Sequence, residues 1–272
     1  LGDVYKRQLI RVLYRRNILE YSDVLEKWKN KDITTVEDLD TALDNFRVLF
    51  AYHSNVIENP QTTIHNTREI FENGKVINYT GDLRTLFELN NQKRCYEYLK
   101  SKIIHKQSIT PALIKELHRI LMDGCYDETR YGKGERPGEY KKHDYVVGEE
   151  IGVPHEDVAD EVEFLCNEIS ENDGKDVLTV AAYFHLNFEG IHAFADGNGR
   201  VGRTLLNYYL MIHDYPPAII YQEDKEQYYM SLAIFDKSER IDGFIEFLKY
   251  ETCKTWSRKT PRLSKGVQSF LL

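Results

Sequence analysis

Apolar residues recur at intervals of three and four along most of this chain, which is the period of a helix with one buried face. The first clear case follows Thr34, where Thr34 and Glu37 match a capping box and predict that a helix begins. This helix is expected to continue to about residue 58, and the apolar positions along its first part are Val36, Leu39, Leu43, Phe46 and Phe50.

The same period predicts further helices over residues 82–99, 110–124, 156–169, 176–188, 200–213, 222–235 and 241–256. Residues 126–154 differ, because glycines separate the short β-prone pieces YVV and IGV, which predict a hairpin. We find no internal repeat and no linker rich in Pro, Gly or Ser. The pattern therefore predicts one compact all-α bundle with a small β-hairpin.

Composition narrows the function classes. The 272 residues are 42% hydrophobic and carry a net charge of −8, which argues against a general nucleic-acid or anionic-membrane binder. Apolar runs fall short of the roughly 20 residues of a membrane span, and the N-terminal residues do not read as a secretory signal. The four cysteines are far apart, so neither a zinc site nor a disulfide framework is expected. A cytoplasmic protein that holds any phosphate at one local site is the simplest expectation.

Residues 192–203, HAFADGNGRVGR, crowd reactive side chains around a glycine turn. Gly197, Asn198 and Gly199 form a turn at the start of a helix, where successive backbone N–H groups and the helix dipole favour an anion. Arg200 and Arg203 share one face of that helix and would be stabilised by an anionic ligand. A phosphate is the expected guest.

Two more side chains extend this interpretation. Asp196 could bind Mg²⁺ together with phosphate oxygens, and His192 could act as a general base near neutral pH. Taken singly, each residue is more often structural or solvated than catalytic. Their joint arrangement favours a nucleoside triphosphate site with a base beside it.

The stretch resembles the Fic family signature H-x-F-x-[DE]-G-N-G-R-x-x-R. Ala193 stands where the family most often has proline, and the resemblance extends over roughly residues 54–250. Every defined position matches, at His192, Phe194, Asp196, Gly197, Asn198, Gly199, Arg200 and Arg203.

The resemblance implies a protein adenylyltransferase, which moves AMP from ATP to a Tyr, Thr or Ser hydroxyl of a target protein. It implies that His192 is the base, that Asp196 holds Mg²⁺, and that residues 197–203 bind the phosphates. A hairpin flap would dock the target, and one later helix would border the adenine. The flap residues are Tyr145, Val146 and Val147, and the adenine residues are Tyr229, Leu232 and Asp236, the last often asparagine in similar proteins.

The segment HSNVIENP resembles the inhibitory motif [ST]-x-x-x-E-[GN] of one Fic class, through Ser54, Glu58 and Asn59. A Glu58 carboxylate that reaches Arg203 would form a bidentate ion pair in the place of the γ-phosphate. In some relatives the same glutamate supports removal of AMP, so de-AMPylation is a second expected activity.

The resemblance also suggests a division of the chain into a helical extension over residues 1–50, a Fic domain over residues 51–258 and a C-terminal tail over residues 259–272. The inhibitory helix would precede the core of that domain. A Fic-type transferase of UMP, phosphate or phosphocholine and a non-catalytic binding module remain as alternatives. The target protein is open, and so is a homodimer that controls Glu58.

Overall fold

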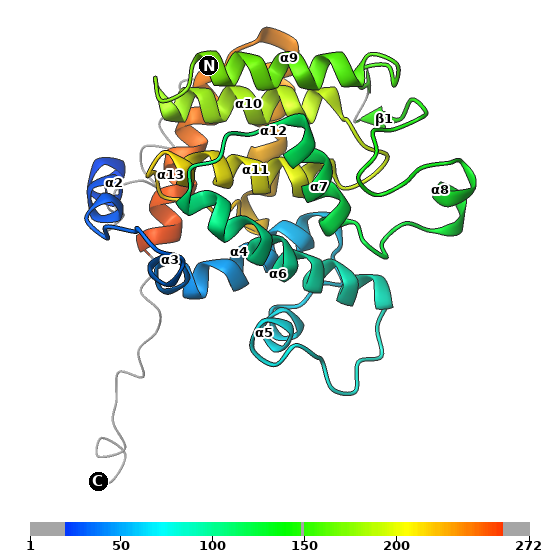
Figure 1. Cartoon of the computed structure of the whole chain (residues 1–272), viewed down its shortest axis with the longest axis horizontal. Coiled ribbons are helices and arrows are strands. Elements are labelled where there is room, and N and C mark those ends of the chain that lie inside the picture. The colour runs from blue at the N-terminus through cyan, green and yellow to red at the C-terminus, as the bar shows by residue number, and fades with distance from the viewer. Residues whose placement is uncertain (1–19, 148–149, 258–272) are drawn as a thin grey trace, which may run out of the picture.

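The computed structural model describes residues 20–147 and 150–257. The start of the expected extension, residues 1–19, and the expected tail, residues 259–272, lie outside the described residues. The described chain is helical apart from one hairpin, which confirms the predicted all-α fold (Figure 1). Its elements are α2 Tyr21–Lys29, α3 Val36–Ala42, α4 Asp44–Glu58, α5 Ile64–Asn73, α6 Leu83–Ile104, α7 Pro111–Leu121, α8 Glu128–Gly132, β1 Val146–Val147, β2 Glu150–Ile151, α9 Val158–Glu171, α10 Val177–Ile191, α11 Asn198–Ile212, the 3-10 turn Gln222–Asp224, α12 Lys225–Ser238 and α13 Asp242–Ser257.

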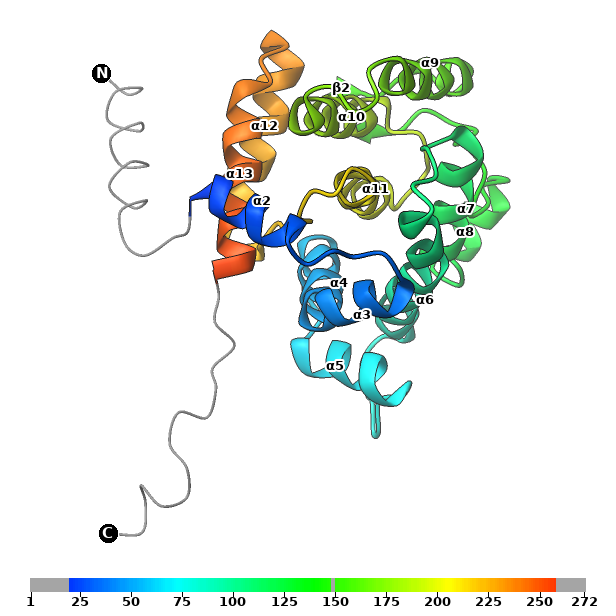
Figure 2. The ribbon, with the colours of Figure 1, turned by 60° about the vertical axis from the view of Figure 1, so that its left-hand side comes forward.

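Helix α11 lies at the centre of the molecule. Figure 2 views it almost end on, with α9 and α10 above, α4 below, and α6 and α7 to one side. Almost all of its side chains are buried, including the charged Arg200 and Arg203. A helix buried on all sides cannot have a solvated polar face, so its arginines must find partners inside the protein.

The predicted helix over residues 34–58 is two helices, so the prediction of one was wrong. The capping box is Thr35 with Asp38, in which each side chain accepts a hydrogen bond from the other residue's backbone N–H at 3.1 and 2.9 Å. The break falls at Leu43, whose φ of −104° and ψ of 8° leave the helical region. Leu39 and Leu43 are both buried. Their spacing in the sequence reflects packing into the same core, and this packing continues across the break, so the apolar period alone does not reveal it.

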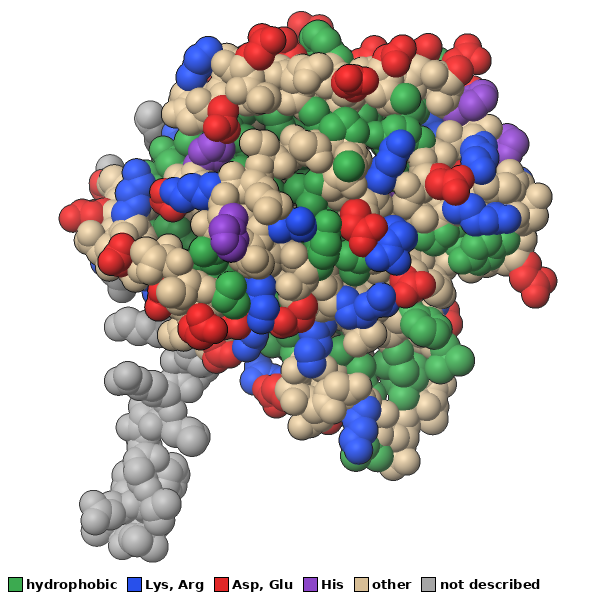
Figure 3. All heavy atoms as spheres, viewed as in Figure 1, with side chains coloured by type: hydrophobic (Ala, Val, Ile, Leu, Met, Phe, Trp, Pro, Cys, Tyr) green, Lys and Arg blue, Asp and Glu red, His purple; other side chains and the backbone are tan. Residues whose placement is uncertain are grey.

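The predicted hairpin is present as two antiparallel strands. Val146 pairs with Ile151 and Val147 with Glu150, so the strands are only two residues long. Acidic side chains gather over α9, along the upper edge of the face in Figure 3. None of the helices in residues 20–147 and 150–257 is long and apolar enough to cross a bilayer.

Candidate active site

The loop between α10 and α11 is set by two left-handed backbone positions. His192 ends α10 with φ 51° and ψ 58°, a conformation that residues other than glycine adopt rarely. Gly197 has φ 85°, and a Cβ there would lie 2.5 Å from the sulfur of Met122. The loop therefore needs glycine at 197, and it carries backbone strain at His192 itself, as functional sites often do.

Asn198 and Phe194 fix the interior of the loop. The Asn198 amide donates to the Phe194 carbonyl at 2.7 Å and accepts from the Phe194 N–H at 2.9 Å. Phe194 is fully buried. The Asn198 side chain thus stabilises the loop at the start of α11, where the first backbone N–H groups of a helix have no partner within the helix.

His118 on α7 supports the loop from outside, and the sequence analysis missed it. Its ring stacks on Phe194 with centroids 3.7 Å apart. Nδ1 accepts the Gly138 N–H at 2.8 Å, so Nε2 carries the proton that is donated to the Asp196 carbonyl at 2.9 Å. Burial lowers the pKa of His118 to about 4, which keeps this ring neutral.

His192 is also neutral at pH 7. Burial lowers its pKa to about 4, and the positive charge of Lys141 acts in the same direction. Asp196 and Glu58 oppose this shift. Lys141 is buried and its backbone N–H donates to the carbonyl of Ala193 at 3.0 Å, so it is close to the loop without belonging to it. A neutral imidazole has the form that a general base requires.

Arginines surround the carboxylate of Asp196. Arg84 donates to Oδ2 at 2.8 Å, Arg200 donates to Oδ1 at 3.2 Å, and Arg130 lies 3.4 Å from Oδ2. Burial would raise the pKa of Asp196, but the charge of Arg200 and the Arg84 hydrogen bond outweigh it and lower the pKa. Asp196 is therefore an ionised carboxylate with cations on both oxygens.

Glu88 on α6 holds two of these three arginines in place. Its Oε1 accepts from Arg84 Nε at 3.0 Å and from Arg200 Nη1 at 2.9 Å. Its Oε2 accepts from the side chain of Asn59 at 2.9 Å. Sequence reasoning missed Arg84 and Glu88 because a pair four residues apart on a helix is usually an exposed ion pair. Here Glu88 is 3% exposed.

Arg203 is paired with the end of α4, as predicted, but it donates to one oxygen of Glu58 and not to the two that a bidentate pair requires. Its Nη2 donates to Glu58 Oε1 and to the Ser54 carbonyl, both at 2.9 Å, and its Nε donates to Ser54 Oγ at 3.2 Å. A Cβ on Gly199 would lie 2.6 Å from Glu58 Oε1. The carboxylate of Glu58 thus lies against the first turn of α11, where a phosphate is expected to bind.

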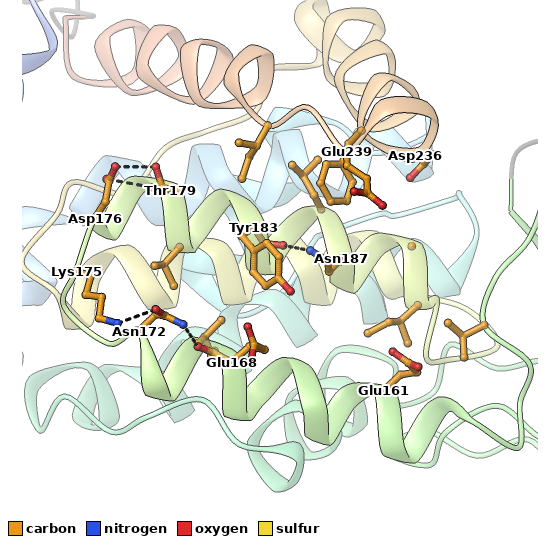
Figure 4. Close-up of a pocket in the computed structure, with 18 residues that line it drawn as sticks. Glu161, Glu168, Asn172, Lys175, Asp176, Thr179, Tyr183, Asn187, Asp236 and Glu239 are labelled. Carbon is orange, nitrogen blue, oxygen red and sulfur yellow. Dashed lines mark hydrogen bonds between the residues drawn. The ribbon is translucent and has the colours of Figure 1, made fainter.

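Tyr229, Leu232 and Asp236 share α12, as predicted. Burial raises the pKa of Tyr229 and the charge of Glu58 adds to this, which indicates that Tyr229 lies on the Glu58 side of the site. Asp236 lies at the border of a groove of about 890 Å³ that follows α10 between α9 and α12 (Figure 4). The groove extends along α10 as far as Ile191, the residue before His192, while Asp236 borders it from α12.

The expected flap residues lie beside the site. Tyr145 is half-buried and donates its hydroxyl to Glu135 at 3.0 Å, which ties the base of the hairpin to the preceding loop. Val146 is 73% exposed. A Cβ on Gly152, just after the hairpin, would lie 2.9 Å from the Cβ of His192, so the end of the hairpin packs against His192.

The loop between α10 and α11 offers a metal ion one carboxylate, that of Asp196. Across the described ranges, no three His, Cys, Asp or Glu side chains converge as a metal site. Asp196 is 20% exposed in its side chain, and one carboxylate suits Mg²⁺ when substrate phosphates supply further oxygens. The residues fit a metal that arrives with phosphate.

Comparisons with known proteins agree with this geometry. The chain is 30% identical over 209 residues to Protein adenylyltransferase Fic of Drosophila persimilis, and 31% over 210 residues to that of Drosophila mojavensis. Each alignment covers 75% of this chain and 39% of the relative, so the chain spans about two fifths of these curated relatives.

Solved structures share the fold. A Fic domain containing signaling protein from Bacteroides thetaiotaomicron has a TM-score of 0.73 at 24% identity, with 86% of this chain and 93% of that chain covered. Fic-1 from C. elegans has a TM-score of 0.71 at 22% identity, with 93% and 73% covered. Residues 108–210, which include the whole loop, match the model of the Fic/DOC family. The chain therefore contains a Fic/DOC family domain.

Proposed function

We propose that the protein transfers AMP from ATP to a hydroxyl group of a target protein, and that Glu58 restrains this reaction. The observation that carries the proposal is a complete signature loop whose base, His192, is neutral and partly exposed at pH 7. The relatives named Protein adenylyltransferase Fic support the same activity.

The reaction can be written with the residues of this site. His192 removes the proton of the target hydroxyl, and the hydroxyl oxygen attacks the α-phosphorus of ATP. A bond forms from that oxygen to phosphorus, and the bond to the pyrophosphate breaks. The pyrophosphate leaves with the bonding electrons. The N–H groups at the start of α11, with Arg200 and Arg203, would stabilise the negative charge that shifts onto the phosphate oxygens.

Asp196 would hold Mg²⁺, which supplies positive charge to the phosphates when it is bound. Tyr229, Leu232 and Asp236 would border the adenine ring from α12. Val146 and Val147, with Tyr145 at the base of the hairpin, would align the backbone of the target by strand pairing. The target itself is proposed only as a protein with an accessible Tyr, Thr or Ser hydroxyl.

The restraint follows from the position of Glu58. Its carboxylate occupies Arg203 and lies against Gly199, so a γ-phosphate and Glu58 would compete for the same guanidinium and the same space. ATP could then bind only in a pose that does not support transfer. Ser54 would hold Arg203 in the resting position through its hydroxyl and carbonyl.

Removal of AMP is a second candidate activity, and one observation favours it. Glu58 Oε1 would lie 2.6 Å from a Cβ on Gly199, just after the loop that His192 begins, so this carboxylate and His192 border one site. A carboxylate in this place could activate water to attack the phosphorus of a modified target. Release of AMP from a target that the protein has itself labelled would test this activity.

The proposed function is tested by incubating the protein with α-labelled ATP and an extract of the source cells. Glu58→Gly should raise label incorporation at least about tenfold, which corresponds to roughly 1.4 kcal/mol of lost restraint. Mass spectrometry of labelled proteins would identify the modified hydroxyl.

Two control variants complete this experiment. Glu72→Gly removes an exposed partner of Arg68 on the neighbouring helix α5 and should leave incorporation unchanged. His192→Ala in the Glu58→Gly background should abolish incorporation. If a folded Glu58→Gly protein transfers no label, the adenylyltransferase proposal is wrong.

A further inference from the structure

The carboxylate of Asp196 already has a cation on each oxygen. Arg84 and Arg130 face Oδ2, and Arg200 faces Oδ1. A metal ion that bound Asp196 in this state would have to displace a guanidinium or share an oxygen with one. The arginines around Asp196 therefore affect whether a metal ion can bind there alone or only together with a phosphate ligand.

The local charges disfavour a free divalent cation. Three guanidiniums lie around Asp196, while the carboxylates that contact them are Asp196, the buried Glu88 and the exposed Asp127, which pairs with Arg130. A divalent ion would add two positive charges to a cluster whose charges are already balanced. Repulsion between like charges about 4 Å apart is strong where water is largely excluded.

A triphosphate reverses this balance. It brings several negative charges into the first turn of α11, where they offset both the arginines and a metal ion. We infer that Arg84 excludes free divalent cations from Asp196, so that the site takes its metal only together with a nucleoside triphosphate. This inference rests on the proposed function for the identity of the nucleotide.

Arg84 is the residue that can decide this selectivity. Its Nη2 makes the shortest contact with Asp196, at 2.8 Å, and its Nε is held by Glu88 at 3.0 Å. Its side chain is 33% exposed, so it can turn outward when a metal and phosphate arrive. The side chain of Arg200 on α11 is only 3% exposed, so it has no room to turn away. Arg130 lies farther from Asp196, with 3.4 Å between Nη2 and Oδ2.

Metal binding can be measured without catalysis, using Mn²⁺ as the probe. The electron paramagnetic resonance signal of free Mn²⁺ decreases as the ion binds. Wild-type protein without nucleotide should leave the signal almost unchanged, whereas Arg84→Gln should bind Mn²⁺ at least about tenfold more tightly. Glu88 keeps Arg200 and Asn59 as partners in this variant, so the fold should be retained.

Matched controls assign the effect to this site. Arg68→Gln breaks another Arg–Glu pair four residues apart, on the exposed surface of α5, and should bind Mn²⁺ like the wild type. Asp196→Asn added to Arg84→Gln should remove the gained affinity. In a Glu58→Gly protein, Mn²⁺ should tighten the binding of a non-hydrolysable ATP analogue relative to metal-free buffer.

The outcomes separate this inference from the proposed function. Tight Mn²⁺ binding by nucleotide-free wild-type protein would overturn the inference, even if label transfer from ATP is observed. Equal Mn²⁺ affinities of wild type and folded Arg84→Gln would also overturn it. Absence of label transfer together with the expected Mn²⁺ behaviour would reject the proposed function and leave the inference standing.

Discussion

Two histidines next to the loop are neutral at pH 7, and they do different things. His118 is enclosed and uses both ring nitrogens to fix the backbone around Asp196 and Gly138. His192 has an unpartnered Nδ1 within the described residues and stands at the strained end of α10. Both ring nitrogens of His118 are used in contacts that hold the loop, whereas Nδ1 of His192 is left for a contact with a bound molecule in the proposed reaction.

The state of His192 predicts the pH dependence of transfer. Because the pKa of His192 is lowered to about 4, the base should remain neutral well below pH 6.5. The kcat/KM of the Glu58→Gly protein should therefore stay level as the pH falls through 6.5 and should decrease only toward pH 4. A steady-state profile with an inflection near 6.5 would show that the acting base is solvated or is another group.

A third histidine predicts the pH dependence of stability. His185 is fully buried, and burial lowers its pKa to about 3; Tyr228, Phe244, Glu189 and the first turns of α11 face it. A lowered histidine pKa means that the unfolded chain binds more protons, so stability is present above pH 6.5 and is lost as the pH falls toward 3. Wild type should lose about 2 kcal/mol more than His185→Gln between pH 7 and pH 5.

Urea unfolding at the two pH values measures this difference, since both proteins share all other titrating groups. Parallel losses in wild type and His185→Gln would mean that the His185 ring is already protonated or solvated in the native state.

At the scale of elements, one helix turn carries the proposed restraint. Ser54 and Glu58 are four residues apart on α4, so both side chains point to the same side and meet Arg203. The backbone carbonyl of Ser54 adds a third contact at 2.9 Å. The last turn of α4 therefore holds Arg203 through three contacts together, and Glu58 is the one of them that carries a negative charge.

This arrangement predicts a graded response. Ser54→Ala removes the contact to Nε but leaves the carbonyl and Glu58, so it should cost the resting state only about 1 kcal/mol. Label incorporation should rise by about fivefold, less than in Glu58→Gly, when both variants are measured with α-labelled ATP. An effect as large as that of Glu58→Gly would place the restraint in the hydroxyl of Ser54.

The elements also show how far the sequence could lead. The helical period, the hairpin glycines and the loop at 192–203 depend on residues close together in the chain, and each could be read locally. The pairing of Glu58 with Arg203 spans 145 residues and became predictable only through a family motif. Arg84 lies 112 residues from Asp196, and its neighbours look like those of a surface helix, so nothing local marks its partner.

At the scale of the molecule, the site is built around the central helix. Arg200 and Arg203 lie within the first two turns of α11. Within residues 20–147 and 150–257, the carboxylates that contact them come from α4, α6 and the loop before α11. Trp28, Leu39 and Leu205 belong to one buried cluster, so α2 and α3 share a core with α11. The proposed domain boundary near residue 50 stays a prediction.

This packing predicts how the restraint responds to protein concentration. Because Glu58 and Arg203 belong to the same chain, the affinity of wild type for an ATP analogue should not change across a wide range of protein concentrations. Calorimetry or fluorescence titration at several concentrations measures it. An affinity that weakens as the protein is concentrated would indicate that a second copy stabilises the paired state.

The three contacts of Glu88 have a consequence of a different kind. Its two oxygens join Asn59, which caps the end of α4, to Arg84 and Arg200, which face Asp196. A displacement of the helix end would pull on the same carboxylate that orients the arginines on the far side of the loop. The Glu58–Arg203 pair and the Arg84–Asp196 contact would then be mechanically coupled through Glu88, so that neither could open without a displacement of the other.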